Sequence, residues 1–183
     1  PFDQPSVDLI LRSSDRVDFY VHRNILAQAS PVFADMRSIP QPSPISQEEA
    51  FDPPIVNVSE DEKTLRRLLF LCYPLKKPDI ESLRDVELVL TAAIKYDMEW
   101  PISSLSDRLQ SSANEHPLQV WAIACRASLE GIAQNAAAKM KAPRPSTTTM
   151  ETSLKTLIGA DGLGVLEGIS AGVYFRLREY LSS

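Results

Sequence analysis

The sequence is poor in the residues that most often build a catalytic or metal site. It contains two cysteines and two histidines among 183 residues. Cys72 and Cys125 lie far apart, and His22 and His116 each stand alone. Neither a zinc site nor a disulfide framework is therefore indicated. No G-x-S-x-G motif is present to supply a nucleophile, so we expect no catalytic residue, no metal and no cofactor.

The chain also lacks a basic stripe and a long apolar run. Its 24 acidic and 19 basic residues give a net charge of -5, which repels a nucleic-acid backbone. Charged residues interrupt the apolar stretches well short of the roughly 18 residues that a membrane span needs. No basic-then-apolar leader opens the sequence. We expect an intracellular protein, in cytoplasm, nucleus or both, that binds neither nucleic acid directly nor a membrane.

Glycines near the C-terminus do not form a nucleotide-binding loop. Gly159, Gly162 and Gly164 follow no predicted strand and precede no Lys-Ser or Lys-Thr pair. Their pattern indicates a turn between two helices.

The N-terminal part predicts a β-hairpin followed by two short helices. Residues 7–12 and 17–21 are rich in β-branched and aromatic residues and are joined by a polar turn. Residues 23–29 then place their apolar side chains on one helical face. Ser30 and Pro31 provide an N-cap and a first-turn proline for a second helix that runs through Met36.

A proline-rich loop, residues 38–54, separates this hairpin of helices from a third strand at residues 55–58. After that strand, Ser59 and Glu62 have the spacing of a capping box, in which each side chain bonds the other residue's backbone amide. We therefore predict that a helix begins there.

Three further helices are predicted from apolar residues at helical spacing. The first carries Leu65, Leu68, Leu69 and Cys72 inward and ends before Pro74. The second covers residues 85–98. Its predicted core face is Val86, Val89, Leu90, Ala93 and Ile94. The third covers residues 101–111.

The composition becomes alanine-rich after residue 112, and strand patterns end there. Helices are predicted from Pro117, over residues 132–140, over 151–158 and over 169–181. Trp121 is expected to pack in the core, with an interface contact as the alternative. The division is therefore a domain of residues 1–112 and a helical extension of residues 113–183.

One set of spacings resembles a known family. His22, Leu26, Ser30 and Phe33 follow the H-x3-L-x3-S-x2-F pattern of BTB/POZ domains, directly after a hairpin that begins at Asp8. The run of residues 90–98, with paired alanines and Tyr96, is similar to the family's alanine-rich helix. The resemblance covers about residues 7–110. The later segment, including Tyr174, Leu177 and Tyr180, is similar to the helical extension of fungal BTB proteins.

The resemblance implies an α+β fold, with a small mixed sheet flanked by short helices and followed by an all-helical extension. It implies a non-enzymatic protein-interaction module that forms homodimers or acts as an adaptor. The alternatives are a substrate adaptor of a cullin-type ubiquitin ligase and a module that recruits transcriptional co-regulators. Phe51 and Asp52 do not reproduce the hydrophobic-x-acidic signature of cullin binders, and only six residues precede Val7, too few for a swapped N-terminal strand.

The resemblance also implies roles for individual residues. Asp8 and Arg23 match the charged positions near the dimer seam of several members, and His22 matches a structural histidine. A buried carboxylate and guanidinium require each other, because either alone would be costly to desolvate. The apolar part of the seam is expected to include or rest on five residues, Ile25, Leu26, Val32, Phe33 and Met36.

Overall fold

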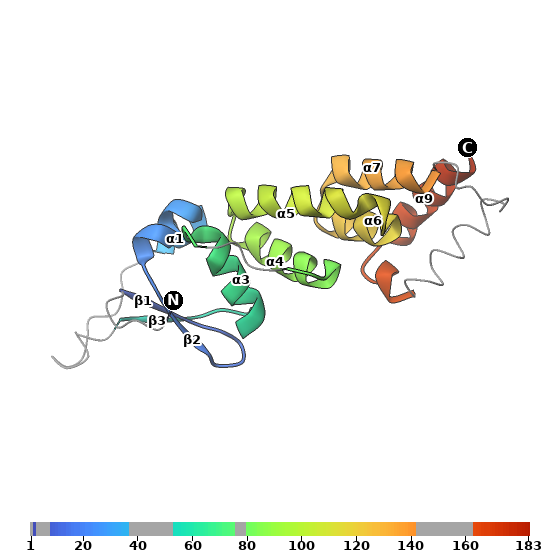
Figure 1. Ribbon diagram of the computed structural model, residues 1–183. Coiled ribbons are helices and arrows are strands. Elements are labelled where there is room, and N and C mark those ends of the chain that lie inside the picture. Colours follow the sequence, from blue (N-terminus) through green and yellow to red (C-terminus); the bar gives the residue numbers. More distant parts are fainter. Residues whose placement is uncertain (1, 3–7, 37–52, 76–79, 142–162) are drawn as a thin grey trace. The chain divides into compact units, whose positions relative to one another are not determined.

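The computed structural model describes residues 2, 8–36, 53–75, 80–141 and 163–183 (Figure 1). The chain forms two compact units, residues 1–103 and 104–183. Among the described residues, the first unit combines a sheet with helices and the second is helical. The predicted α+β class with C-terminal helices is therefore confirmed. The predicted domain boundary after residue 112 stays a prediction.

Three strands of the described chain form one mixed sheet in the order β2-β1-β3. β1 (Leu9–Arg12) pairs antiparallel with β2 (Asp18–Val21) and parallel with β3 (Ile55–Asn57). The three apolar residues of the central strand β1 are all buried, as in a strand covered on both faces. Arg12 and Asp18 lie opposite each other at the end of the hairpin, with Arg12 Nε 2.6 Å from Asp18 Oδ1.

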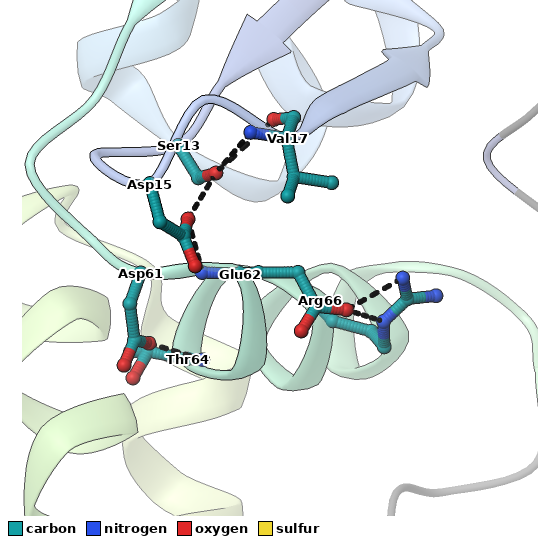
Figure 2. A network of polar contacts seen from close by, with 7 residues as sticks. All are labelled: Ser13, Asp15, Val17, Asp61, Glu62, Thr64 and Arg66. Carbon is teal, nitrogen blue, oxygen red and sulfur yellow. Dashed lines mark hydrogen bonds and ion pairs between the residues drawn. The ribbon is translucent and has the colours of Figure 1, made fainter.

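The turn of this hairpin also contacts the start of α3 (Glu62–Cys72). Asp15 Oδ1 accepts hydrogen bonds from Ser13 Oγ at 2.6 Å and from the Glu62 amide at 3.0 Å (Figure 2). The carboxylate of Asp61 is the N-cap and accepts from the Thr64 amide at 2.8 Å. Both carboxylates satisfy amides that a helix start leaves free and favour the positive end of its dipole.

The capping box predicted from Ser59 and Glu62 is wrong. Because Asp61 caps the helix, Glu62 is its first residue, and its carboxylate accepts from Arg66 Nε at 2.7 Å instead. Ser59 Oγ donates to Glu60 Oε1 and accepts from Lys95 Nζ. Aspartate and serine are about equally good caps, so the sequence pattern alone did not distinguish the two possible start positions.

The remaining helices of the first unit agree with the predicted periodicity. α1 (Arg23–Ala29) packs against α2 (Pro31–Met36), and α3 packs against α4 (Leu83–Lys95). The predicted inward position of Ile94 is wrong, since it is 40% exposed. Successive residues turn by about 100°, so Ile94 lies beyond the margin of the buried arc, whereas Ala92 at the other margin is buried.

An aromatic cluster, which the sequence did not reveal, holds Phe2 against the first unit. Phe2 is 2% exposed, and its ring lies 5.5 Å from that of Phe70 and 5.1 Å from that of Tyr73, both edge to face. A third ring, Phe19, lies 6.1 Å away. The carbonyl of Phe2 accepts a hydrogen bond from the Tyr20 amide at 3.0 Å, so Phe2 adds one backbone bond to the outer side of β2.

The second unit is built around two packed helices, α6 (Pro117–Arg126) and α7 (Glu130–Lys141) (Figure 1). α5 (Glu99–Ser111) crosses from the first unit into the second, and η2 (Ser112–Asn114) follows it. η3 (Leu163–Leu166) and α9 (Ala171–Ser182) complete the described part. Trp121 is 4% exposed, which confirms its core position.

Some predicted features lie outside the described residues. These are most of the proline-rich loop 38–54, the helix expected at residues 151–158, and Gly159 and Gly162.

We predict that Phe2→Ala lowers the free energy of unfolding by about 3 kcal/mol, because it removes a large side chain from a buried cluster. Urea unfolding of the first unit measures this change. Leu88→Ala is the control, since Leu88 is 42% exposed on α4, and we expect a change within about 0.5 kcal/mol. Equal effects of the two substitutions would show that Phe2 contributes no more to stability than a surface residue.

Candidate interaction surface

The α1–α2 hairpin presents one set of apolar side chains and buries another. Leu26 is fully buried and Phe33 nearly so, so these two residues support the surface from within. Ile25 and Val32 are partly exposed, and Met36 is 36% exposed. Of the five apolar residues predicted for the interface, only these three can touch another chain directly.

Asp8 and Arg23 are in contact, but not from side chain to side chain. The Arg23 amide donates to Asp8 Oδ1 at 2.8 Å, and Arg23 Nε donates to the Asp8 carbonyl at 2.9 Å. Asp8 is exposed and Arg23 partly exposed. In the single chain, each side chain therefore bonds the other residue's backbone at the surface, and no buried ion pair joins these two described residues. The side chain of His22 does not cap α1. The carboxylate of Asp8, which lies outside the helix, accepts the hydrogen bond of its first amide instead.

A small hollow joins the hairpin to the sheet. Its volume is about 30 Å³, room for about one water molecule and far below the size of a small-molecule site. The lining brings together Arg23, Leu26, Phe33 and Met36 of the predicted residues. It does not include Asp8, Ile25 or Val32. The other lining residues are Leu9, Pro54 and Val56.

The structural role expected of His22 belongs to its backbone. Its amide donates to the hydroxyl of Tyr73 at 2.8 Å, and its carbonyl accepts from the amides of Ile25 and Leu26. The imidazole is exposed. Burial raises the pKa of Tyr73, which keeps this phenol protonated. The position therefore ties the end of β2 to the end of α3 without using the side chain of His22.

A polar network holds the hairpin to the end of α4, and of its members the sequence indicated only Ser30, as an N-cap. Ser30 is buried, and its Oγ accepts from the Phe33 amide while donating to the carbonyl of Tyr96. Tyr96 stacks on Phe33 with ring centroids 4.9 Å apart. Its hydroxyl donates to Glu60 Oε2 at 2.7 Å, and Lys95 Nζ lies 2.9 Å from Glu60 Oε1. The buried side-chain donors and acceptors of this network therefore all have hydrogen-bond partners inside the fold.

The pKa values in this network follow from burial and pairing. Burial raises the pKa of Tyr96 to about 12. Burial also disfavours ionised Glu60, but hydrogen bonds from Lys95 and Tyr96 outweigh it and lower the pKa of that carboxyl. The reverse holds for Lys95, where burial is outweighed by bonds to Tyr96 and Glu60 that raise its pKa. At neutral pH the network therefore contains a carboxylate, an ammonium and a neutral phenol.

The described part of the chain offers few side chains suited to metal binding or catalysis. No three or more His, Cys, Asp or Glu side chains gather there in a way that could hold a metal ion. Both cysteines are free. Burial raises the pKa of Cys72 to about 12 and also raises that of Cys125, so neither is a ready nucleophile. No helix within the described ranges has the length and apolarity that crossing a membrane requires.

Comparison with known proteins identifies the first part of the chain. Residues 2–113, more than half of the sequence, match the family model of the BTB/POZ domain. No curated protein matches the chain. The matched range contains the whole α1–α2 hairpin, the sheet and the polar network around Ser30.

We predict that Glu60→Gln lowers the free energy of unfolding by about 2 kcal/mol at pH 7. It leaves Lys95 without its ion-pair partner, and the cost stays below that of a fully buried pair because Lys95 is half-exposed. Since folding lowers the pKa of Glu60 from an ordinary value of 4.5, its stabilisation is present above that pH and is lost as the pH falls through the folded-state pKa. The difference between wild type and Glu60→Gln should therefore shrink as the pH falls below about 4.5.

Urea unfolding at a series of pH values measures this dependence. Glu62→Gln is the matched control, because Glu62 forms a partly exposed pair with Arg66 four residues along the same helix, worth only about 0.3–0.5 kcal/mol. A pH-independent difference between wild type and Glu60→Gln would contradict the assigned role of the carboxylate.

Proposed function

We propose, from the premise that this chain belongs to the BTB/POZ family, that two copies associate through the α1–α2 hairpin and its junction with the sheet. BTB/POZ domains are non-catalytic protein-protein interaction modules, so the partners of this chain are proteins. The observation that carries the proposal is that the hollow between the hairpin and the sheet brings together Arg23, Leu26, Phe33 and Met36.

Apolar side chains on both sides of this junction are available for contact. Met36 is 36% exposed at the end of α2, and Ile55 is 46% exposed on the edge strand β3. Ile25 and Val32 are partly exposed on the hairpin. Interfaces gain affinity from a few apolar groups that become fully buried on a firmly packed base, and Leu26 and Phe33 provide such a base here.

The polar centre of the proposed seam is Asp8 with Arg23. Each side chain bonds the backbone of the other residue. These bonds use one oxygen of the Asp8 carboxylate and one of the five N–H donors of the Arg23 guanidinium. In a two-fold dimer, any contact from one copy to the other occurs twice. Asp8 of each copy can then pair with Arg23 of the other, which satisfies both charges as the seam excludes water.

A substrate adaptor of a cullin-type ubiquitin ligase is the second candidate. Its structural support is two further exposed apolar side chains, Ile94 at the end of α4 and Trp100 in the first turn of α5, which are 40% and 61% exposed. Such residues are suited to a second partner because they do not line the hollow at the proposed seam. Recruitment of transcriptional co-regulators has no separate structural observation in its favour.

We further propose that the protein belongs to the fungal type and works inside the cell. The first statement rests on the pattern of Tyr174, Leu177 and Tyr180, which falls on α9, and on the helix that begins at Pro117. The second rests on the family, whose members are typically intracellular.

We predict that the full chain sediments as a dimer at micromolar concentration and that Met36→Glu weakens the dimer at least about tenfold, because it places a carboxylate in an apolar seam. Sedimentation velocity over a dilution series measures the dissociation constant. Val17→Glu is the matched control, because Val17 is equally exposed, at 36%, but lies in the β1–β2 turn. A monomer at about 100 μM wild-type protein, or an equal loss in both variants, would refute the proposed seam.

For the cullin alternative, we expect a purified cullin N-terminal domain to bind the chain in a calorimetric titration and Trp100→Ala to weaken that binding. Met36→Glu should leave it unchanged if the dimer seam and the cullin surface are separate. Absence of heat of binding would exclude this role.

A further inference from the structure

The second unit contains an open cleft of about 470 Å³. It lies between α7 and α9, and residues of α6 form its third side. Apolar side chains dominate it, and several of them are small. They are Trp121, Ala124, Ala133, Ala137, Val173 and Leu177. The alanines leave room that larger side chains would fill, so the cleft is a consequence of the alanine-rich composition of α6 and α7.

Contacts at two places hold α9 beside the cleft. At the C-terminal ends, Lys141 Nζ donates to Ser183 Oγ at 3.2 Å and lies 4.9 Å from the ring centroid of Tyr180. Before the start of α9, Arg126 Nη1 donates to the carbonyls of Val165 and Glu167. These contacts join α9 and the segment before it to α6 and α7 in the free chain, which lowers the cost of ordering the cleft when a ligand binds.

Charge distinguishes the wall formed by α9. Arg176 of α9 and Glu130 at the start of α7 both line the cleft and are exposed, so the basic group of the lining belongs to α9 and the acidic one to α7. The described residues include no hydrogen-bond or ion-pair partner for the Arg176 guanidinium. A guanidinium at the rim of an apolar cleft favours a ligand that combines an apolar group with a carboxylate.

We propose that this cleft docks an amphipathic helix of a partner protein, with a large apolar side chain inserted against Trp121 and an acidic side chain paired with Arg176. The cleft lies outside the residues 2–113 that match the BTB/POZ domain, so this interaction is additional to the proposed dimer. The two would fail independently, since no residue of the α1–α2 hairpin lines the cleft.

A helix fits the cleft better than a small molecule. Small-molecule sites enclose most of their ligand, whereas the rim residues Gln134, Arg176 and Tyr180 of this cleft are exposed. A helix laid along the cleft would cover these rim residues and bury the apolar strip between them. Its apolar contacts would recur at every third or fourth residue, the usual mode of helix-in-groove recognition.

The test uses a display library of helices of about 16 residues, with randomised apolar residues along one face and either Glu or Lys at one flanking position. Selection against the full chain should enrich the Glu set. Fluorescence polarisation of the selected peptides then measures binding. Arg176→Glu should weaken it at least tenfold, and replacing the peptide's Glu with Lys should restore it.

Two matched controls separate the cleft from the rest of the unit. Arg178→Glu alters an exposed arginine on the same helix that does not line the cleft, and should bind like wild type. Ala133→Trp fills the cleft and should abolish binding, whereas Ala138→Trp, exposed elsewhere on α7, should not. Circular dichroism confirms that each variant is folded.

Protection of Cys125 gives an independent readout, because this thiol lines the cleft. Alkylation is measured at about pH 9, because the raised pKa of Cys125 slows its reaction at neutral pH. Bound peptide should slow the alkylation at least tenfold relative to the same chain without peptide. The proposal is overturned if the library yields no binder, if Arg176→Glu and Arg178→Glu bind alike, or if saturating peptide leaves Cys125 alkylation unchanged. Sedimentation of the same samples shows whether the dimer persists.

Discussion

The two hydrogen bonds of the buried Ser30 hydroxyl join α2 to the end of α4 inside the first unit. A hydroxyl removed from water must find both a donor and an acceptor, or it costs stability. Here it accepts from the first turn of α2 and donates to the carbonyl of Tyr96 just after α4. Residues that are distant in sequence thus meet at one oxygen. The ring of Tyr96 then stacks on Phe33, which fixes the base of the surface that Met36 and its neighbours present.

Much of the fold was predictable because the spacing of apolar residues along the sequence indicates which face of a helix or strand is buried. The hairpin, the third strand and the helices of the described chain lie where the patterns predicted them, and Leu65, Leu68 and Leu69 face the core. The errors concern positions where local patterns are ambiguous. Asp61 and Ser59 can each cap a helix, and only the contact between Asp15 and the Glu62 amide, which comes from a different element, favours the observed start.

The candidate site was less predictable than the fold. The H-x3-L-x3-S-x2-F pattern located the hairpin, but it did not show that Leu26 and Phe33 are buried while Met36 is exposed. The pairing of Glu60 with Lys95 and Tyr96 joins residues far apart in the sequence, and no spacing rule reports such a contact. Phe2 had no pattern around it at all. Its burial depends on three aromatic partners from β2 and from the end of α3.

The position of Phe2 has a consequence for how the sheet can grow. Its carbonyl takes the Tyr20 amide, one of the groups that β2 turns away from β1. An edge strand with free amides invites pairing with a strand of another molecule. Along β2 such a strand would first have to pull a phenyl ring out of its aromatic pocket. Extension of the sheet by a foreign strand along the outer side of β2 is therefore disfavoured by the burial of one aromatic side chain.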